Sequence, residues 1–191
     1  AGACLTRING LILVPALATE IIGRFWRMRR FNWRWLWLGL VPCGFLGYLW
    51  LNYEVTGDFF AFAGIMQEHW YKKLASPWFG IHDVWLRIFG MNVNEGLNEF
   101  IGVVMITLFM VWSWFRLRAA YSVWITLNWL LINSTAYVLS VPRYALTLFP
   151  IFILLSKACT GRRFWYAMLT VWSLLYLALY CGRFAQSLWA F

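Results

Sequence analysis

Apolar stretches long enough to cross a bilayer dominate this sequence and leave few other ways to fold it. Hydrophobic residues make up 63% of the 191 residues and charged residues only 12%, whereas soluble domains average about 45–50% and about 25%. A chain of this size has too little interior to hide so many apolar side chains, so lipid must solvate the surplus. Because a spanning helix needs about 20 apolar residues, the sequence predicts an all-α membrane protein, one domain over residues 1–191, with six transmembrane helices. The predicted spans cover residues 5–23, 35–53, 97–115, 121–139, 144–156 and 164–180.

Basic residues alternate from one connection to the next, which predicts how the chain lies in the membrane. Ten of the sixteen Lys and Arg residues fall in the connections after the first, third and fifth spans. Cytoplasmic loops are enriched in Lys and Arg, so these connections are placed in the cytoplasm, and residues 54–95 outside it or in a lumen. The alternation also explains the net charge of +9 without a nucleic-acid partner. The expected location is a bacterial plasma membrane or the endoplasmic reticulum.

The long segment 54–95 predicts a helix that lies along the outer membrane surface. Large apolar residues, ending in a lysine, recur there at spacings of three or four: Phe59, Phe62, Met66, Trp70 and Lys73. This spacing gives one apolar stripe with a basic end, a pattern typical of helices that lie in the membrane interface. Pro77 and Gly80 end the pattern, and residues 83–89 predict a second short helical piece.

Small and polar residues within the spans predict contacts between helices. Gly39, Gly44 and Gly47 in the second span would let another helix approach closely. Asn128 and Asn133 in the fourth span are five residues apart, so they do not share one helix face well, and hydrogen bonds to other helices are expected for them.

The common catalytic and metal-binding patterns are absent from the sequence. No P-loop, dinucleotide-binding, HExxH or GxSxG pattern occurs, which removes the commonest phosphate-loop, hydride-transfer, zinc-protease and hydrolase functions. None of the four cysteines forms a CxxC pair, so neither a zinc site nor a redox motif is indicated. A disulfide between Cys4 and Cys181 stays open, because both could lie on one side of the membrane. No metal ion and no firm cofactor are predicted.

Arg7 lies at the outer end of the first span, far from the cytoplasmic arginines. A guanidinium at this place could bind a phosphate with two parallel hydrogen bonds. The alternative is an arginine whose long side chain reaches the outer headgroups.

A second polar group lies in the outer segment and combines Asp58 with Gln67, Glu68, His69 and Trp70. Carboxylates and a histidine on one segment could perform acid–base chemistry, and the neighbouring aromatic rings could stack on a sugar. Alternatively, Asp58 caps the start of the interfacial helix and the aromatic residues anchor it among headgroups.

A third group is formed by Ser140, Val141, Pro142, Arg143 and Tyr144. Pro142 favours a turn that opens a helix, so Arg143 would sit beside the partial positive charge of a helix start. This combination predicts an anion site. The alternative is an isolated exception to the positive-inside rule.

Three segments resemble a known family, and they occur in the order expected for it. In chain order they are residues 6–10 (TRING), residues 52–62 (NYEVTGDFFAF) with 67–70 (QEHW), and residues 140–144 (SVPRY) followed by Leu148, Phe149 and Pro150. Together they resemble the PIG-V-like mannosyltransferases of the GT-C class of polytopic glycosyltransferases. The resemblance covers most of the chain and implies a GT-C-like fold.

The resemblance implies transfer of a sugar, typically mannose, from a polyprenyl-phosphate donor at the extracytoplasmic or luminal face. Arg7 and Arg143 would bind the donor phosphate. Asp58, as a candidate catalytic residue, would line the donor or acceptor site together with four substrate-binding residues: Gln67, His69, Trp70 and Tyr144. Membrane lipids and the polyprenyl-linked sugar are the expected partners, and the participation of a divalent metal is left open.

One departure from the family concerns the catalytic base. GT-C enzymes carry an acidic residue in their first extracytoplasmic loop, and the family's members are longer than this chain. We therefore expect the carboxy-terminal part of an enzyme whose base lies in an amino-terminal half or a partner subunit, with Asp58 as the alternative base. A non-catalytic membrane subunit or lipid-binding scaffold is the competing function. A transporter is disfavoured, because no charged residue is expected within the spans and no inverted repeat is found.

Overall fold

The computed structural model describes residues 2–6, 8–70, 73–90 and 93–187, which are helical almost throughout. The elements are α1 (Gly2–Thr6), η1 (Ile8–Ile12), α2 (Leu13–Met28), η2 (Trp33–Gly39), α3 (Leu40–Thr56), α4 (Ala61–Trp70), α5 (Pro77–Ile88), α6 (Val93–Arg116), α7 (Ala119–Asn133), α8 (Val141–Ala145), α9 (Phe149–Cys159) and α10 (Arg163–Ala185). Within the described ranges, β-structure is limited to an isolated bridge between Leu74 and Thr135. The predicted all-α class is confirmed.

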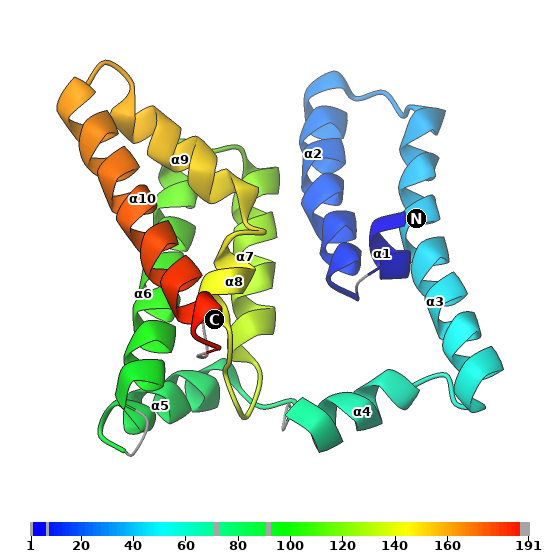
Figure 1. Cartoon of the computed structure of the whole chain (residues 1–191). Helices are drawn as coiled ribbons and strands as arrows, with labels where there is room; N and C mark the ends of the chain where they lie inside the picture. Colours follow the sequence, from blue (N-terminus) through cyan, green and yellow to red (C-terminus); the bar gives the residue numbers. More distant parts are fainter. Residues whose placement is uncertain (1, 7, 71–72, 91–92, 188–191) are drawn as a thin grey trace.

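The helices form two groups that are joined in two ways (Figure 1). The first group holds α1, α2 and α3, and the second holds α5 to α10. Helix α4 crosses between them at the lower end of the view. The groups also touch directly, because α2 packs against α7.

The three basic connections lie together at one end of the molecule. Figure 1 shows the connections from α2 to α3, from α6 to α7 and from α9 to α10 at the upper end, with α4 and α5 at the lower end. This arrangement matches the alternation of charge along the sequence.

Three helices are long and apolar enough to cross a membrane. They are Trp33–Thr56, formed by η2 and α3 together, Gly96–Arg116 within α6, and Arg163–Ala185, which is α10. At about 1.5 Å per residue each reaches the roughly 30 Å of a hydrocarbon core. None of the apolar window of α10 is buried inside the protein. A helix that is apolar and exposed on all sides requires lipid or another membrane helix around it, so the chain is a membrane protein.

The other three predicted spans fall on shorter helices. The region 5–23 is divided among α1, η1 and α2, the region 121–139 ends as a helix at Asn133, and the region 144–156 is divided between α8 and α9. Helix α9 has 11 residues, a rise of about 16 Å, which is half of what a bilayer core requires. Proline explains part of this division. Pro142 and Pro150 occupy the first turns of α8 and α9, where their missing N–H removes no helical hydrogen bond.

The hydrophobic core lies between α5, α6, α7 and α9. Its largest buried side chains include Ile106, Ile125, Leu148 and Leu154. The chain between α4 and α5 pairs with the loop after α7, because the Ala75 amide donates to the Ser134 carbonyl (3.1 Å) and the Ala136 amide donates to the Lys73 carbonyl (2.8 Å). This pairing ends α7 at Asn133 and fixes α5 beneath it.

The segment 54–95 forms the two predicted helices. Helix α4 covers most of the predicted apolar stripe, and α5 covers most of the second piece. The start of α5 is capped by Ser76, whose hydroxyl oxygen accepts a hydrogen bond from the Phe79 amide, and Pro77 occupies its first turn.

The small and polar residues within the spans behave in different ways. Gly44 is buried, and a Cβ atom at Gly47 would come within 3.3 Å of Leu5, so α1 does approach α3 closely here. The prediction that the asparagines bond to other helices is wrong. Asn128 and Asn133 donate to the Trp124 and Trp129 carbonyls of their own helix.

Two further expectations are corrected. Cys4 and Cys181 are both free, so the disulfide left open by the sequence is absent. The spans are not free of charge either, because Glu99 lies in α6 and is buried.

Gly80 provides a test of the packing between α5 and α7. A Cβ atom there would lie 2.2 Å from the Asn133 carbonyl oxygen, whereas one at Gly23 in α2 would meet nothing within 4 Å. We expect Gly80→Ala to lower the free energy of unfolding in detergent micelles by about 1–3 kcal/mol, since backbone atoms must move apart. Gly23→Ala should leave it unchanged or raise it by up to about 1 kcal/mol. Equal stability of both variants would contradict the close contact.

Candidate functional site

The start of α8 is held by a buried carboxylate from α6. Glu99 Oε1 accepts a hydrogen bond from the Ser140 amide and Oε2 accepts one from the Val141 amide, each at 2.7 Å. Glu99 is only 2% exposed. Charged acceptors make such bonds stronger than neutral ones, and a negative charge is favoured at the start of a helix. The carboxylate therefore fixes where α8 begins and how it faces α6.

Close packing of α8 on α6 makes this bond geometry possible. Gly102 lies one turn after Glu99, and a Cβ atom there would come within 2.9 Å of Val141 Cγ1 and 3.4 Å of Pro142 Cδ. Ser140 adopts a left-handed conformation with φ of 64°, which turns the chain so that its amide and that of Val141 both point at Glu99. Figure 1 shows α8 between the loop after α7 at the lower end and α9 above it.

Glu99 occupies part of the predicted anion site. The sequence suggested that the amides opening this helix would help Arg143 to bind an anion. Two of these amides, those of Ser140 and Val141, already bind the Glu99 carboxylate.

Arg143 projects from the helix that Glu99 holds. Its side chain is exposed, and its guanidinium carbon lies 5.7 Å from the centre of the Tyr144 ring. Within the described part of the chain, Arg143 has no ion pair with a carboxylate. The guanidinium can therefore receive an anionic ligand.

Two tyrosines of α10 interact with each other. The Tyr176 hydroxyl donates to the Tyr180 hydroxyl at 2.9 Å.

A partly buried ion pair lies in α5. The guanidinium of Arg87 lies 2.9 Å from Asp83 Oδ2, donates to the Val138 carbonyl and stacks 4.4 Å from the centre of the Tyr137 ring. These contacts tie α5 to the loop that leads into α8. The spacing of Asp83 and Arg87, four residues apart, is the only sequence signal for this pair.

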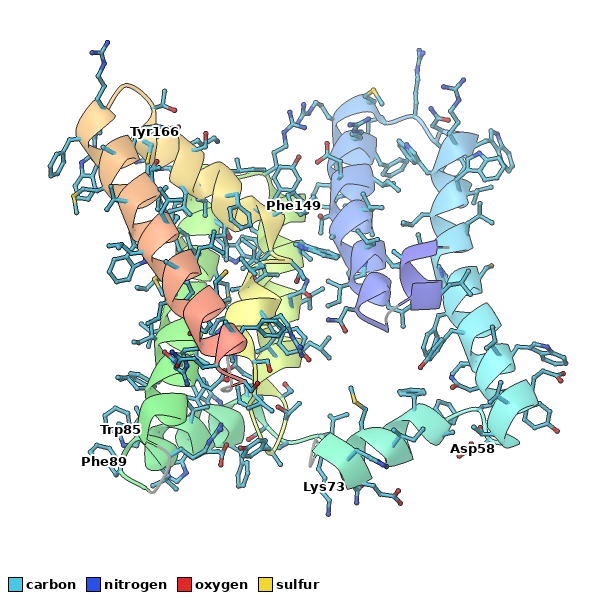
Figure 2. The ribbon with its side chains drawn as sticks, in the orientation of Figure 1. Asp58, Lys73, Trp85, Phe89, Phe149 and Tyr166 are labelled. Atoms are coloured by element: carbon cyan, nitrogen blue, oxygen red, sulfur yellow. The ribbon has the colours of Figure 1, made fainter. Side chains whose placement is uncertain are left out.

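The residues predicted on the outer segment lie apart from Arg143. Asp58 precedes α4 and is exposed, with its Oδ1 accepting a hydrogen bond from the Phe60 amide at 2.9 Å. Gln67 and His69 are exposed on α4. Figure 2 shows Asp58 and Lys73 at opposite ends of this helix. No hydrogen bond or ion pair between described residues connects Asp58, Gln67 or His69 with Arg143.

Some predictions cannot be placed. Arg7 and the side chain of Trp70 lie outside the described residues. Among the residues that are described, no three His, Cys, Asp or Glu side chains are grouped to hold a metal ion.

Comparison with known proteins adds no relative. No protein-family model matches the chain, and neither the curated proteins nor the solved structures give a significant match. The resemblance to PIG-V-like mannosyltransferases therefore stays a prediction from the sequence.

Substitution of Glu99 tests the clamp on α8. Glu99→Ala leaves two buried amides without an acceptor, and each such group costs about 1–3 kcal/mol, so we expect a large loss of stability in detergent. Glu99→Gln keeps one acceptor and should lose less. Glu68→Ala, which removes an exposed carboxylate from α4, should have little effect. If all three variants unfold at the same denaturant concentration as the wild type, Glu99 does not hold α8.

Proposed function

We propose that this chain is the carboxy-terminal part of a multi-pass membrane glycosyltransferase that transfers mannose from a polyprenyl-phosphate donor. The proposal rests on the resemblance to the PIG-V-like family, on the membrane-length helices, and on one observation about the site. Arg143 is exposed and lacks a carboxylate partner within the described chain, while the helix that carries it is held by Glu99. An arginine on the predicted extracytoplasmic side is an exception to the positive-inside rule, which makes Arg143 a candidate functional residue.

The proposed chemistry assigns Arg143 to the phosphate of the donor. When the sugar leaves the polyprenyl phosphate, negative charge develops on the phosphate oxygen, and a fixed guanidinium stabilises that charge. The two hydrogen bonds at the helix start hold the backbone that carries Arg143, which keeps its guanidinium within reach of one place. Arg7 is the proposed second cation at the phosphate.

The sugar and the acceptor are assigned to the aromatic and amide side chains of the resemblance. Tyr144, beside Arg143, and Gln67, His69 and Trp70 of α4 are the proposed substrate contacts. Asp58 is the weakest assignment, since its bond to the Phe60 amide gives it a structural role in the turn before α4. The base that deprotonates the acceptor hydroxyl is therefore proposed to be an acidic residue of the family's first extracytoplasmic loop.

The proposed topology is six passes with the reaction on the extracytoplasmic or luminal face. The basic connections would face the cytoplasm, and α4 would lie in the opposite interface, where lipid-linked substrates arrive. The membrane would be a bacterial plasma membrane or the endoplasmic reticulum. The shorter helices α2, α7 and α9 would complete their passes with the segments that flank them.

A second candidate function is a non-catalytic membrane subunit or lipid-binding scaffold. The separation of α4's polar residues from Arg143 favours it, because an active site requires its groups to converge on one substrate.

Transfer of radiolabelled mannose from polyprenyl-phosphate mannose tests the proposal, in membranes that contain the product of the complete open reading frame. We expect Arg143→Ala to lower the rate about 100-fold or more, the scale of a lost charge-stabilising group, and Arg143→Lys to retain part of it. Arg30→Ala, which removes an exposed cation from the opposite end, should leave the rate unchanged. An unchanged rate in Arg143→Ala would reject the phosphate role. A wild-type protein that transfers no polyprenyl-linked sugar would reject the enzyme and favour the scaffold.

A further inference from the structure

A hollow opens between α6, α9 and α10 at the basic end of the molecule. Its volume is about 990 Å³, at the upper end of the roughly 300–1,000 Å³ usual for ligand pockets. It is lined by the last turn of α6, the second half of α9 and the first half of α10. Tyr166, near the start of α10, marks this end of the helix in Figure 2.

Among the described residues, three cations and no acidic side chain line the hollow. The cations are Arg116, Lys157 and Arg162, and each is exposed. Lys157 donates to the Arg116 carbonyl at 3.1 Å, which leaves its charge at the rim. The positive charge of the lining therefore favours an anionic ligand.

The start of α10 adds donors beside these cations. Arg162 occupies the cap position, and no side chain caps the helix there. The first amides of a helix have no acceptor within the helix and favour an anion. Since α10 is 23 residues long, its dipole is fully developed at this end.

The remaining wall is apolar and aromatic. It includes Trp112, Leu154, Trp165, Met168 and Trp172. Helix α10 packs mainly against α9, so the hollow separates its upper half from α6. An apolar space between two membrane helices, with cations at the headgroup level, matches an acyl chain below a phosphate.

We infer that this hollow binds an anionic phospholipid, with the phosphodiester on Arg116, Lys157 and Arg162 and an acyl chain between α6 and α10. Basic pockets between helices at the cytoplasmic boundary are suited to such headgroups. The inference does not depend on the proposed transferase, whose donor phosphate is assigned to Arg143 on a different helix.

Cys159 gives a direct readout, because it lines the hollow, whereas Cys43 and Cys181 lie outside it and are exposed. The purified protein is treated with N-ethylmaleimide in micelles that contain phosphatidylglycerol, phosphatidylcholine, or phosphatidylcholine with inorganic phosphate. Mass spectrometry then gives the modification rate of each cysteine. We expect phosphatidylglycerol alone to slow the reaction of Cys159 several-fold and to leave Cys43 and Cys181 unchanged.

Charge variants separate a built site from general attraction to a basic surface. In Arg116→Gln/Arg162→Gln the phosphatidylglycerol concentration needed for half-maximal protection should rise about 10- to 30-fold, since each cation near an anionic lipid contributes about 1 kcal/mol. The matched control Arg30→Gln/Arg34→Gln removes the same charge from the α2–α3 connection and should change that concentration less than twofold. Equal losses in both double variants would overturn the site. Equal protection by phosphatidylcholine, or by inorganic phosphate, would overturn the anionic lipid as its occupant.

Discussion

The hydrogen bonds between Glu99 and the amides of Ser140 and Val141 are the contact that positions α8 against α6 in the second group of helices. Between α7 and α9 the chain leaves regular helix in a protein that lipid surrounds. Backbone N–H groups that are buried in a protein rarely stay unpaired, because the lost hydrogen bond costs free energy, and Ser140 and Val141 are both buried. Glu99 satisfies two of them and draws α8 onto α6, where Gly102 leaves room for Val141. The positions of Arg143, Tyr144 and the start of α9 follow from this one contact.

The two ends of the molecule differ in their chemistry. The upper end in Figure 1 holds the basic connections and the hollow lined by Arg116, Lys157 and Arg162, which suits the anionic surface of a cytoplasmic leaflet. The lower end holds α4 and α5, whose charges are partly neutralised within the protein, as in the pair of Asp83 and Arg87. Apolar helices that are exposed to their surroundings, α3 and α10 above all, connect the two ends. A donor lipid and a structural lipid would thus bind through different helices.

The sequence predicted those features that local pattern controls. The helices over 97–115 and 164–180 are found almost as expected, because an uninterrupted apolar run specifies a helix directly. Helix α4 followed from its spacing, and the Asp58 carboxylate accepts a hydrogen bond from Phe60 in the turn before this helix. Contacts between distant residues could not be predicted. Glu99 and Ser140 are 41 positions apart, and nothing local distinguishes a carboxylate that caps another helix from one that faces water. The division of residues 144–156 between α8 and α9 was also missed. A proline such as Pro150 can either kink a long helix or begin a new one, and the local sequence does not distinguish the two.

Amide hydrogen exchange at Ser140 and Val141 tests the role of Glu99 most directly. The wild-type protein and Glu99→Gln would be compared in nanodiscs, with exchange resolved to single residues. Our account predicts slow exchange of both amides in the wild type, because both are buried and donate hydrogen bonds to a carboxylate. It predicts faster exchange at one or both in the variant, while the amides of the central turns of α6 stay protected. Fast exchange of both amides in the wild type, or identical rates in the two proteins, would contradict it.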